Sequence, residues 1–135
     1  MNWSRSTWTS LAAISGFASV AFGAFAAHGI DDPLAKEWLR TGSTYEFLHA
    51  LATLACAALT VSGAPRARFA PAFFLGGSLL FSGSLYAMAL GGPRWLGAVT
   101  PIGGLLFLAG WAVLAWAVRR MDQAGASDLG GRAKP

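Results

Sequence analysis

Three side chains that could bind a metal ion or carry a proton lie at matching ends of two apolar segments. Glu46 and His49 are three residues apart, so on a helix they share one face. His28 directly follows an earlier apolar run. If a short connection joins the two segments, the three side chains could meet. Imidazole and carboxylate groups bind divalent metals and relay protons inside membranes, so a metal or proton site is one hypothesis for this group.

The same three residues could also have structural roles alone, without binding a metal ion or a proton. Glu46 fits a capping box that begins at Ser43, and His28 lies at the edge of its apolar run, where water reaches an imidazole. His49 is one turn further in and needs a hydrogen-bond partner. We favour a structural histidine over a ligand, and two histidines at one boundary do not suit haem. The sequence predicts neither a metal site nor a cofactor.

Hydroxyl groups follow on a later apolar segment, at Ser82, Ser84 and Tyr86. They could bond across to His49 or to the backbone near Thr100. The sequence contains no Ser-His-Asp set, no phosphate-binding glycine loop and no pair of buried carboxylates, so we do not expect an enzyme. What remains is a candidate polar cluster formed by His28, Glu46, His49, Ser82 and Tyr86.

The composition is that of a membrane protein. Of 135 residues, 55% are apolar and 12% are charged, whereas soluble domains carry about 25% charge. The length allows one domain. The net charge is +4, but the basic residues stand at the ends of apolar runs, where they suit lipid headgroups better than nucleic acid. The single cysteine, Cys56, cannot form an internal disulfide.

Four apolar runs each approach the roughly 20 residues that a helix needs to cross a bilayer. They cover about 8–27, 45–62, 69–90 and 101–118. Inside lipid the backbone must satisfy its own hydrogen bonds, which favours helices. We therefore predict an all-α integral membrane protein, a four-helix up-down bundle. The first run is expected to be retained rather than cleaved as a signal peptide, because three more spans follow.

Boundary signals predict a short interfacial helix between the first two spans. Asp32 before Pro33 is typical of an N-cap with proline at the first helical position, and the short helix would cover Leu34–Arg40. Gly42 could end it, and Ser43 could begin the second span. The transmembrane domain is then 1–122, followed by a disordered cytoplasmic tail at 123–135, rich in Gly, Ala and Ser.

Basic residues predict the orientation. With both termini in the cytoplasm, the inner side holds Arg5, Arg66, Arg68, Arg119, Arg120, Arg132 and Lys134. The outer side then holds Lys36, Arg40 and Arg94. Because basic residues concentrate on the cytoplasmic side, this arrangement is favoured.

Small residues recur at helical spacing and predict the packing faces. Hydrophobicity cannot hold helices together in lipid, so close approach through small side chains does so instead. A pore lining is the alternative for the same residues. So many small residues in four helices also favour self-association. The residues concerned are Ser15, Gly16, Ser19, Gly23, Gly76, Gly83, Gly103, Gly104 and Gly110.

Four motifs resemble a known family. They are Gly23-Ala-Phe-Ala-Ala-His28-Gly, Tyr45-Glu-Phe-Leu-His49-Ala-Leu, Leu80-Phe-Ser-Gly-Ser-Leu-Tyr86 and Val99-Thr-Pro-Ile-Gly-Gly104 followed by Ala109-Gly-Trp111. In order and spacing, from about Leu11 to Val118, the chain resembles the domain-of-unknown-function 423 proteins, small inner-membrane proteins of the YgdD and transmembrane-protein-256 type. The resemblance implies a multi-pass inner-membrane protein and brings no activity. The family has glutamine where this chain has Glu46, and glycine at Ala26.

Three hypotheses for function follow. The first is an interaction or accessory protein that self-associates or docks on a larger membrane complex, with lipid and protein as its partners and no nucleic acid. The second is a transporter or channel for an ion or small solute, formed by an oligomer and lined by His49, Glu46, Tyr86 and the hydroxyls of Ser82 and Ser84. The third is a metal or redox role for His28, Glu46 and His49.

Overall fold

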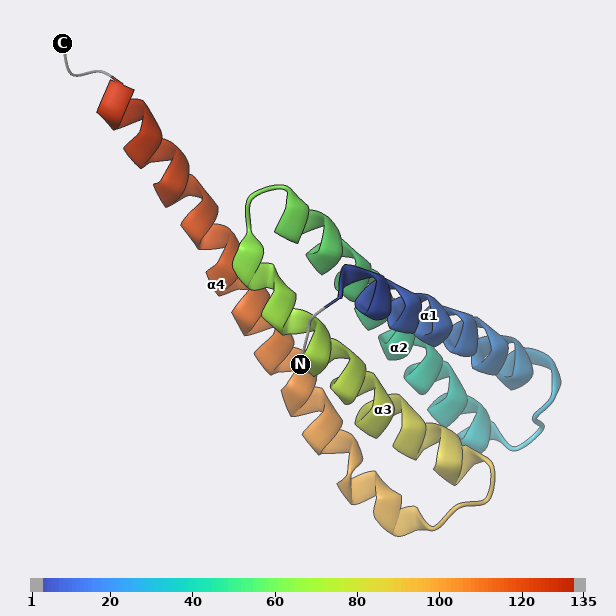
Figure 1. The fold of residues 1–135 in the computed structure, drawn as a ribbon. Helices are drawn as coiled ribbons and strands as arrows, with labels where there is room; N and C mark the ends of the chain where they lie inside the picture. Colours follow the sequence, from blue (N-terminus) through green and yellow to red (C-terminus); the bar gives the residue numbers. More distant parts are fainter. Residues whose placement is uncertain (1–3, 133–135) are drawn as a thin grey trace.

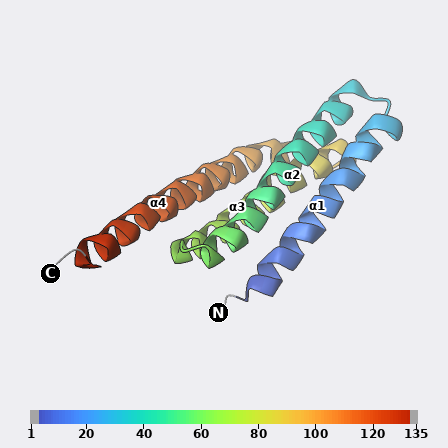
Figure 2. The same ribbon diagram turned by 90° about the horizontal axis from the view of Figure 1, so that it is seen from above.

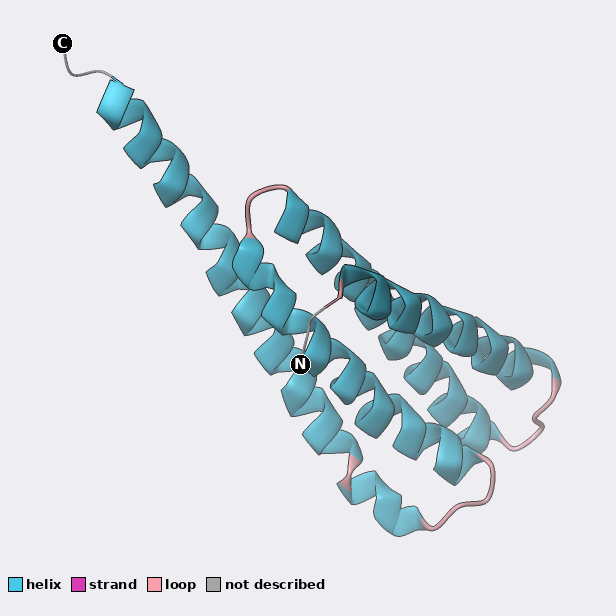
Figure 3. Cartoon of the chain, viewed as in Figure 1, coloured by secondary structure: helices cyan, strands magenta, loops and turns pink. Residues whose placement is uncertain are grey.

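The chain folds into four long helices that lie side by side. The computed structural model describes residues 4–132, with side chains through Arg119. Within these residues it contains helices and no strand (Figure 3). The long helices are α1 (Arg5–His28), α2 (Pro33–Val61), α3 (Ala70–Ala89) and α4 (Thr100–Arg132), and two 3-10 helices, η1 (Pro65–Phe69) and η2 (Arg94–Ala98), precede α3 and α4.

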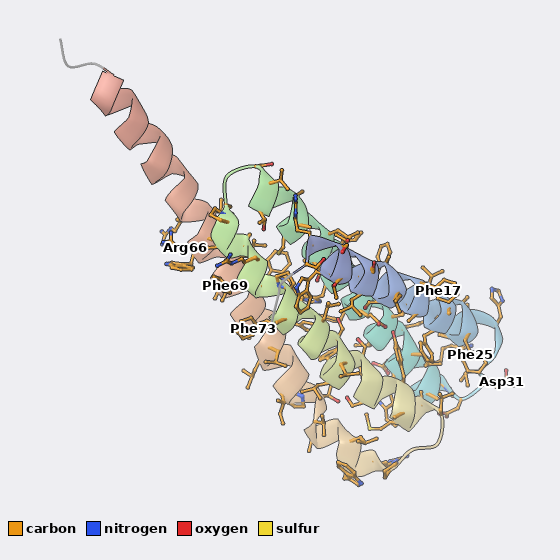
Figure 4. The ribbon with its side chains drawn as sticks, viewed as in Figure 1. Phe17, Phe25, Asp31, Arg66, Phe69 and Phe73 are labelled. Atoms are coloured by element: carbon orange, nitrogen blue, oxygen red, sulfur yellow. The ribbon has the colours of Figure 1, made fainter. Side chains whose placement is uncertain are left out.

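All four predicted spans are present as helices. The segments long and apolar enough to cross a membrane are Arg5–His28, Pro33–Val61, Pro65–Ala89 and Arg94–Arg119. Large apolar side chains cover their outer faces. Phe17 of α1, for example, points away from the other helices and is 78% exposed (Figure 4). An exterior of this kind is suited to lipid.

The helices pack in chain order, with α1 against α2, α2 against α3 and α3 against α4. Short turns join them at alternate ends, and α1 and α4 lie on opposite sides of the central pair (Figures 1 and 2). A smaller contact joins α1 to α3. Because α1 packs on α2 and α4 packs on α3, one side of α2 and one side of α4 are not covered by another helix of the chain.

The prediction of a separate interfacial helix at Leu34–Arg40 is wrong, because α2 continues without a break from Pro33 to Val61. Its 29 residues span about 44 Å at about 1.5 Å per residue, longer than the roughly 30 Å hydrocarbon core. The first two turns carry Lys36, Glu37 and Arg40. The polar segment that suggested a second helix is thus the first part of α2.

Gly42 stands in α2 for packing rather than to end a helix. A Cβ atom at this position would lie 2.6 Å from Cε1 of Tyr86 in α3, so glycine makes room for the tyrosine ring. The capping box predicted at Ser43 is also absent. The Ser43 hydroxyl donates to the Arg40 carbonyl, and the Glu46 carboxylate has partners on other helices. Glycine was misread because it serves both helix ends and close packing.

The predicted cap at the start of α2 is present, one short turn after α1. The Ala35 amide donates to the Asp32 carboxylate over 2.8 Å, with Pro33 at the first helical turn. Beyond the other end of α2, and after α3, Gly63 and Gly91 adopt positive φ values of 108° and 92°. Only glycine takes up this conformation without strain, so both residues help to terminate their helices.

At its C-terminal end α4 is helical through Arg132, whereas the sequence favoured disorder from residue 123. The final residues of the expected tail, 133–135, lie outside the described residues. Adding one more residue to an existing helix costs little, because the costly nucleation step has already been taken. In Figure 1 this part of α4 projects beyond the other helices.

Glycines on α3 and α4 bring these two helices into close contact. A Cβ on Gly103 would clash with the Phe81 backbone, and one on Gly110 would lie 2.5 Å from the Phe74 ring. Gly77, which the sequence analysis did not single out, faces Phe107 at the same distance. On α1, a Cβ on Gly23 would lie 3.3 Å from the Ser43 hydroxyl of α2.

The other predicted packing residues make looser contacts with neighbouring helices. Ser19 is buried and bonds to its own helix. A Cβ on Gly76 or Gly104 would make ordinary contacts, with Leu106 and Phe81 respectively. Gly16 and Gly83 would meet nothing within 4 Å, so they are free to contact lipid or another protein.

We expect Gly103→Ala to lower the free energy of unfolding, because the methyl group would push α4 away from the Phe81 backbone. Overpacking of this kind costs about 1–3 kcal/mol, partly offset by a helix-propensity gain of about 1 kcal/mol. Gly83→Ala is the matched control on α3, since its methyl group meets open space and should be neutral or stabilising. Thermal unfolding in detergent measures both. Equal melting temperatures for the two variants would show that the α3–α4 contact is looser than described.

Candidate functional site

A buried carboxylate joins three helices. Oε1 of Glu46 in α2 accepts a hydrogen bond from the Ser15 hydroxyl of α1 over 2.9 Å. Oε2 accepts one from the Tyr86 hydroxyl of α3 over 2.7 Å. Glu46 and Ser15 are each 9% exposed, and Tyr86 is 7% exposed. Each carboxylate oxygen thus has a donor from a different neighbouring helix.

Glu46 is buried at the start of the apolar part of α2, and its partner Ser15 lies about midway along α1. Glu46 is thirteen residues from the start of α2, about 20 Å along the axis, and about 9 Å beyond Arg40, the preceding charged residue. Between the charged residues at the ends of the four apolar segments, the sequence has no other Asp, Glu, Lys or Arg. An ionisable side chain at such a position is costly and usually functional.

Two further contacts hold the tyrosine in place. The Phe22 ring of α1 stacks on Tyr86, with centroids 3.9 Å apart and planes inclined by 19°. One turn before the tyrosine, the Ser82 hydroxyl donates to the Gly42 carbonyl over 2.8 Å. Tyr86 therefore lies between α1 and α2, and Gly42 supplies the space beside its ring.

His49 forms a second polar site, which joins α2 to α4. Its Nδ1 lies 2.6 Å from the Tyr45 carbonyl, and its Nε2 lies 3.1 Å from Nε1 of Trp111. A carbonyl only accepts and an indole N–H only donates, so the geometry requires a neutral imidazole with its proton on Nδ1. The Phe107 ring stacks on the imidazole at 3.5 Å. Both nitrogens are engaged, which leaves no lone pair for a metal.

The candidate polar cluster is thus divided. Glu46 contacts α1 and α3, whereas the His49 ring bonds to its own helix and to α4. His28 is exposed at the end of α1, away from both. No three His, Cys, Asp or Glu side chains within the described part of the chain come close enough to hold a metal ion. The structure does not bring together the triad on which the metal hypothesis depends.

Ser84 and Thr100 form a third, smaller link. Their hydroxyl oxygens lie 2.7 Å apart, between α3 and the start of α4. The sequence analysis allowed Ser84 to bond to the backbone near Thr100, whereas in the structure its partner is the threonine side chain. The cross-helix bond satisfies two hydroxyls at once, which an apolar environment favours.

Several residues in these sites were not identified as site residues from the sequence. Ser15 was predicted to pack, and its role as a donor to Glu46 depends on the pairing of α1 with α2. Trp111 offered a clearer signal, because an indole N–H far from either end of an apolar helix needs an acceptor. Gly42 was identified as a helix end rather than as part of the site.

An apolar groove of about 800 Å³ lies between α2 and α4, and α3 contributes one lining residue to it. His49, Phe107 and Phe81 are among the residues that line it. One wall includes Ala52 and Ala55 of α2, and the other includes Gly104, Leu105 and Trp111 of α4. Because α4 packs on α3, the groove opens sideways, toward lipid if the helices cross a membrane.

We expect Trp111→Phe to destabilise the fold by about 1 kcal/mol, because His49 Nε2 would lose its donor within an apolar region. Thermal unfolding in detergent measures the change. In a His49→Phe background the same tryptophan substitution should cost nothing further, since the bond is already gone. Trp95→Phe is the control, because Trp95 is 67% exposed on η2. Additive effects of the two substitutions would contradict the hydrogen bond.

Comparison with known proteins agrees with this architecture. The chain is 44% identical over 115 residues to the UPF0382 membrane protein of Haemophilus influenzae, an alignment that covers 83% of this chain and 93% of the relative. It is 41% identical over 120 residues to the UPF0382 inner membrane protein YgdD of Escherichia coli K12, covering 86% and 92% respectively. A UPF0382 membrane protein of Staphylococcus epidermidis is 38% identical over 107 residues, covering 77% and 88%.

No solved structure matches the chain. The family model described as "Protein of unknown function (DUF423)" matches residues 22–104, a range that includes Glu46, His49, Ser82 and Tyr86. The four apolar helices, the family match and the membrane-protein relatives lead to one conclusion. The chain belongs to the DUF423 family and is a multi-pass membrane protein.

Proposed function

We propose that this protein is a non-enzymatic interaction protein of the inner membrane. It associates with itself or docks on a larger membrane complex through the groove between α2 and α4. The observation that carries the proposal is the groove itself. It is apolar, has a volume of about 800 Å³ and is open along one side of the four helices.

The walls of the groove suit a transmembrane helix. In lipid, helices associate where small residues allow their backbones to come close. Ala52 and Ala55 on one wall and Gly104 on the other provide such positions. Tyr45, Phe81 and Phe107 add aromatic surface, which contributes strongly at interfaces. A helix from a second copy or from another subunit is the proposed occupant.

In the proposed arrangement the helices cross the membrane in up-down order, with both termini in the cytoplasm. Lys and Arg support this orientation, because most of them belong to the termini and the turn between α2 and α3. In Figure 4, Arg66 and Asp31 lie at opposite ends of the bundle. The Arg66 guanidinium lies 5.2 Å from the Trp116 ring, a pairing typical of a membrane interface.

Transport by an oligomer is the second candidate and has less support. A transport path needs polar groups along the whole membrane thickness. Toward η1, beyond the buried hydroxyl of Ser78, the interior of the bundle contains an apolar cluster around Phe74, which includes Cys56, Ala67 and Ala70. The described polar side chains therefore favour helix association over conduction.

Filling the groove should prevent association. We expect Ala55→Leu or Gly104→Leu to weaken complex formation at least about tenfold, which corresponds to about 1.4 kcal/mol, because the larger side chain occupies the space of the partner helix. Native mass spectrometry of protein gently extracted from its own membranes gives the fraction in complexes.

Ala21→Leu is the matched control for Ala55→Leu, since Ala21 is exposed on α1 and does not line the groove. It should assemble like the wild type. The proposal fails if both groove variants form complexes at the wild-type level, or if the wild type is monomeric under conditions that preserve other membrane complexes. A complex with a foreign subunit would point to the accessory role, and a homo-oligomer to self-association.

A further inference from the structure

Beyond docking, the geometry points to a binding site for a proton inside the membrane. We infer that Glu46, held by Ser15 and Tyr86, takes up and releases a proton while the three helices stay in place. The site lies on the α1–α3 side of α2, whereas the proposed docking groove lies between α2 and α4. The two proposals can therefore be tested separately.

The first argument is the lack of a balancing charge around Glu46. Tyr86 is the titratable group that faces it from α3. On α1 the contact is Ser15, because Arg5 and His28 are at the ends of that helix. On α2, Tyr45 precedes Glu46, and His49 turns its ring toward α4. Within the described side chains, no cation contacts the carboxylate. A proton is the smallest ligand that neutralises it in an apolar setting.

The second argument is that the same heavy-atom positions serve both protonation states. A serine or tyrosine hydroxyl can donate or accept. When Glu46 is ionised, both hydroxyls donate to it over 2.9 and 2.7 Å. When a hydronium ion of the aqueous phase gives up a proton that binds Oε1, water is left behind. The new O–H group can donate to the Ser15 oxygen once the serine hydrogen has turned away. Proton uptake then requires the rotation of one hydroxyl.

The third argument is a line of hydroxyls that leads from the site. Ser78, Ser82 and Tyr86 are four residues apart on α3 and so share one face, and all three are buried. Ser82 bonds to Gly42. Within the described part of the chain, Ser78 Oγ is the one buried side-chain oxygen with no hydrogen-bond partner. This hydroxyl lies about 12 Å along α3 from Tyr86, on the η1 side, and can still donate and accept hydrogen bonds.

A metal ion fits the site less well. One carboxylate and two hydroxyls supply a single negative charge, and metal sites for hard cations usually combine more oxygen ligands. Each carboxylate oxygen also has a hydroxyl donor already at hydrogen-bond distance.

The chain allows the Glu46 carboxyl to be observed alone. It has two glutamates, Glu37 and Glu46, and Glu37 is exposed at the start of α2. A Glu37→Gln variant grown with glutamate labelled with carbon-13 at its side-chain carboxyl carries one labelled group. Carbon-13 NMR of this protein in lipid vesicles, recorded over a range of pH, reports the protonation state of Glu46 directly.

We expect the signal to move from the carboxylate position to the carboxylic-acid position as the pH falls, reversibly and without unfolding. Adding Tyr86→Phe removes one donor to the ionised form, so proton affinity should rise about tenfold. Ser84→Ala is the matched control, since the buried Ser84 hydroxyl of the same helix bonds to Phe81 and Thr100 rather than to Glu46, and it should leave the titration unchanged.

Three results would contradict the inference. A signal that stays at the carboxylate position at every pH at which the protein is folded would mean that Glu46 binds no proton. A signal that stays at the acid position throughout would mean that it never releases one. A titration that is the same with and without the Tyr86 hydroxyl would remove that residue from the site.

Discussion

The interior of this protein is organised by the requirement that a carboxylate buried among apolar helices be satisfied by protein groups. Water is not present in a bilayer core to solvate it, so its donors must come from neighbouring helices. Ser15 and Tyr86 provide them, one from α1 and one from α3. These two bonds set the relative positions of three helices, and Gly42 must be glycine for the tyrosine ring to fit.

The fourth helix is held by a different kind of contact. Gly77, Gly103 and Gly110 allow α3 and α4 to approach closely. Because the hydrophobic effect does not drive helices together in lipid, van der Waals contacts of this kind stabilise their association. One polar bond links α4 to α2: Trp111 donates to His49, and both residues line the groove. Because α4 follows α3 rather than closing the bundle, the groove between α2 and α4 stays open.

Two polar sites on neighbouring turns of α2 thus contact different helices and suit different tasks. The His49 side of α2 belongs to an apolar groove with small residues on its walls, which favours contact with another helix. The Glu46 side is buried among α1, α2 and α3 and provides a single carboxyl with two hydroxyl partners. If both proposals hold, a partner in the groove would lie about one helix diameter from a group that changes its charge.

The sequence by itself determined the membrane architecture, because a bilayer imposes length and apolarity on every segment that crosses it. The four spans, and the cap at Asp32, follow from local patterns. Tertiary structure alone decided that α2 is continuous, that Glu46 and His49 belong to separate sites, and that His28 belongs to neither. The reason is that the sequence pattern fits two explanations in each case. Gly42 could end a helix or make room for a neighbouring side chain, and Glu46 and His49, three residues apart, could form one site or two. Only the neighbouring helices, through the Tyr86 ring on one side and Trp111 on the other, select between them.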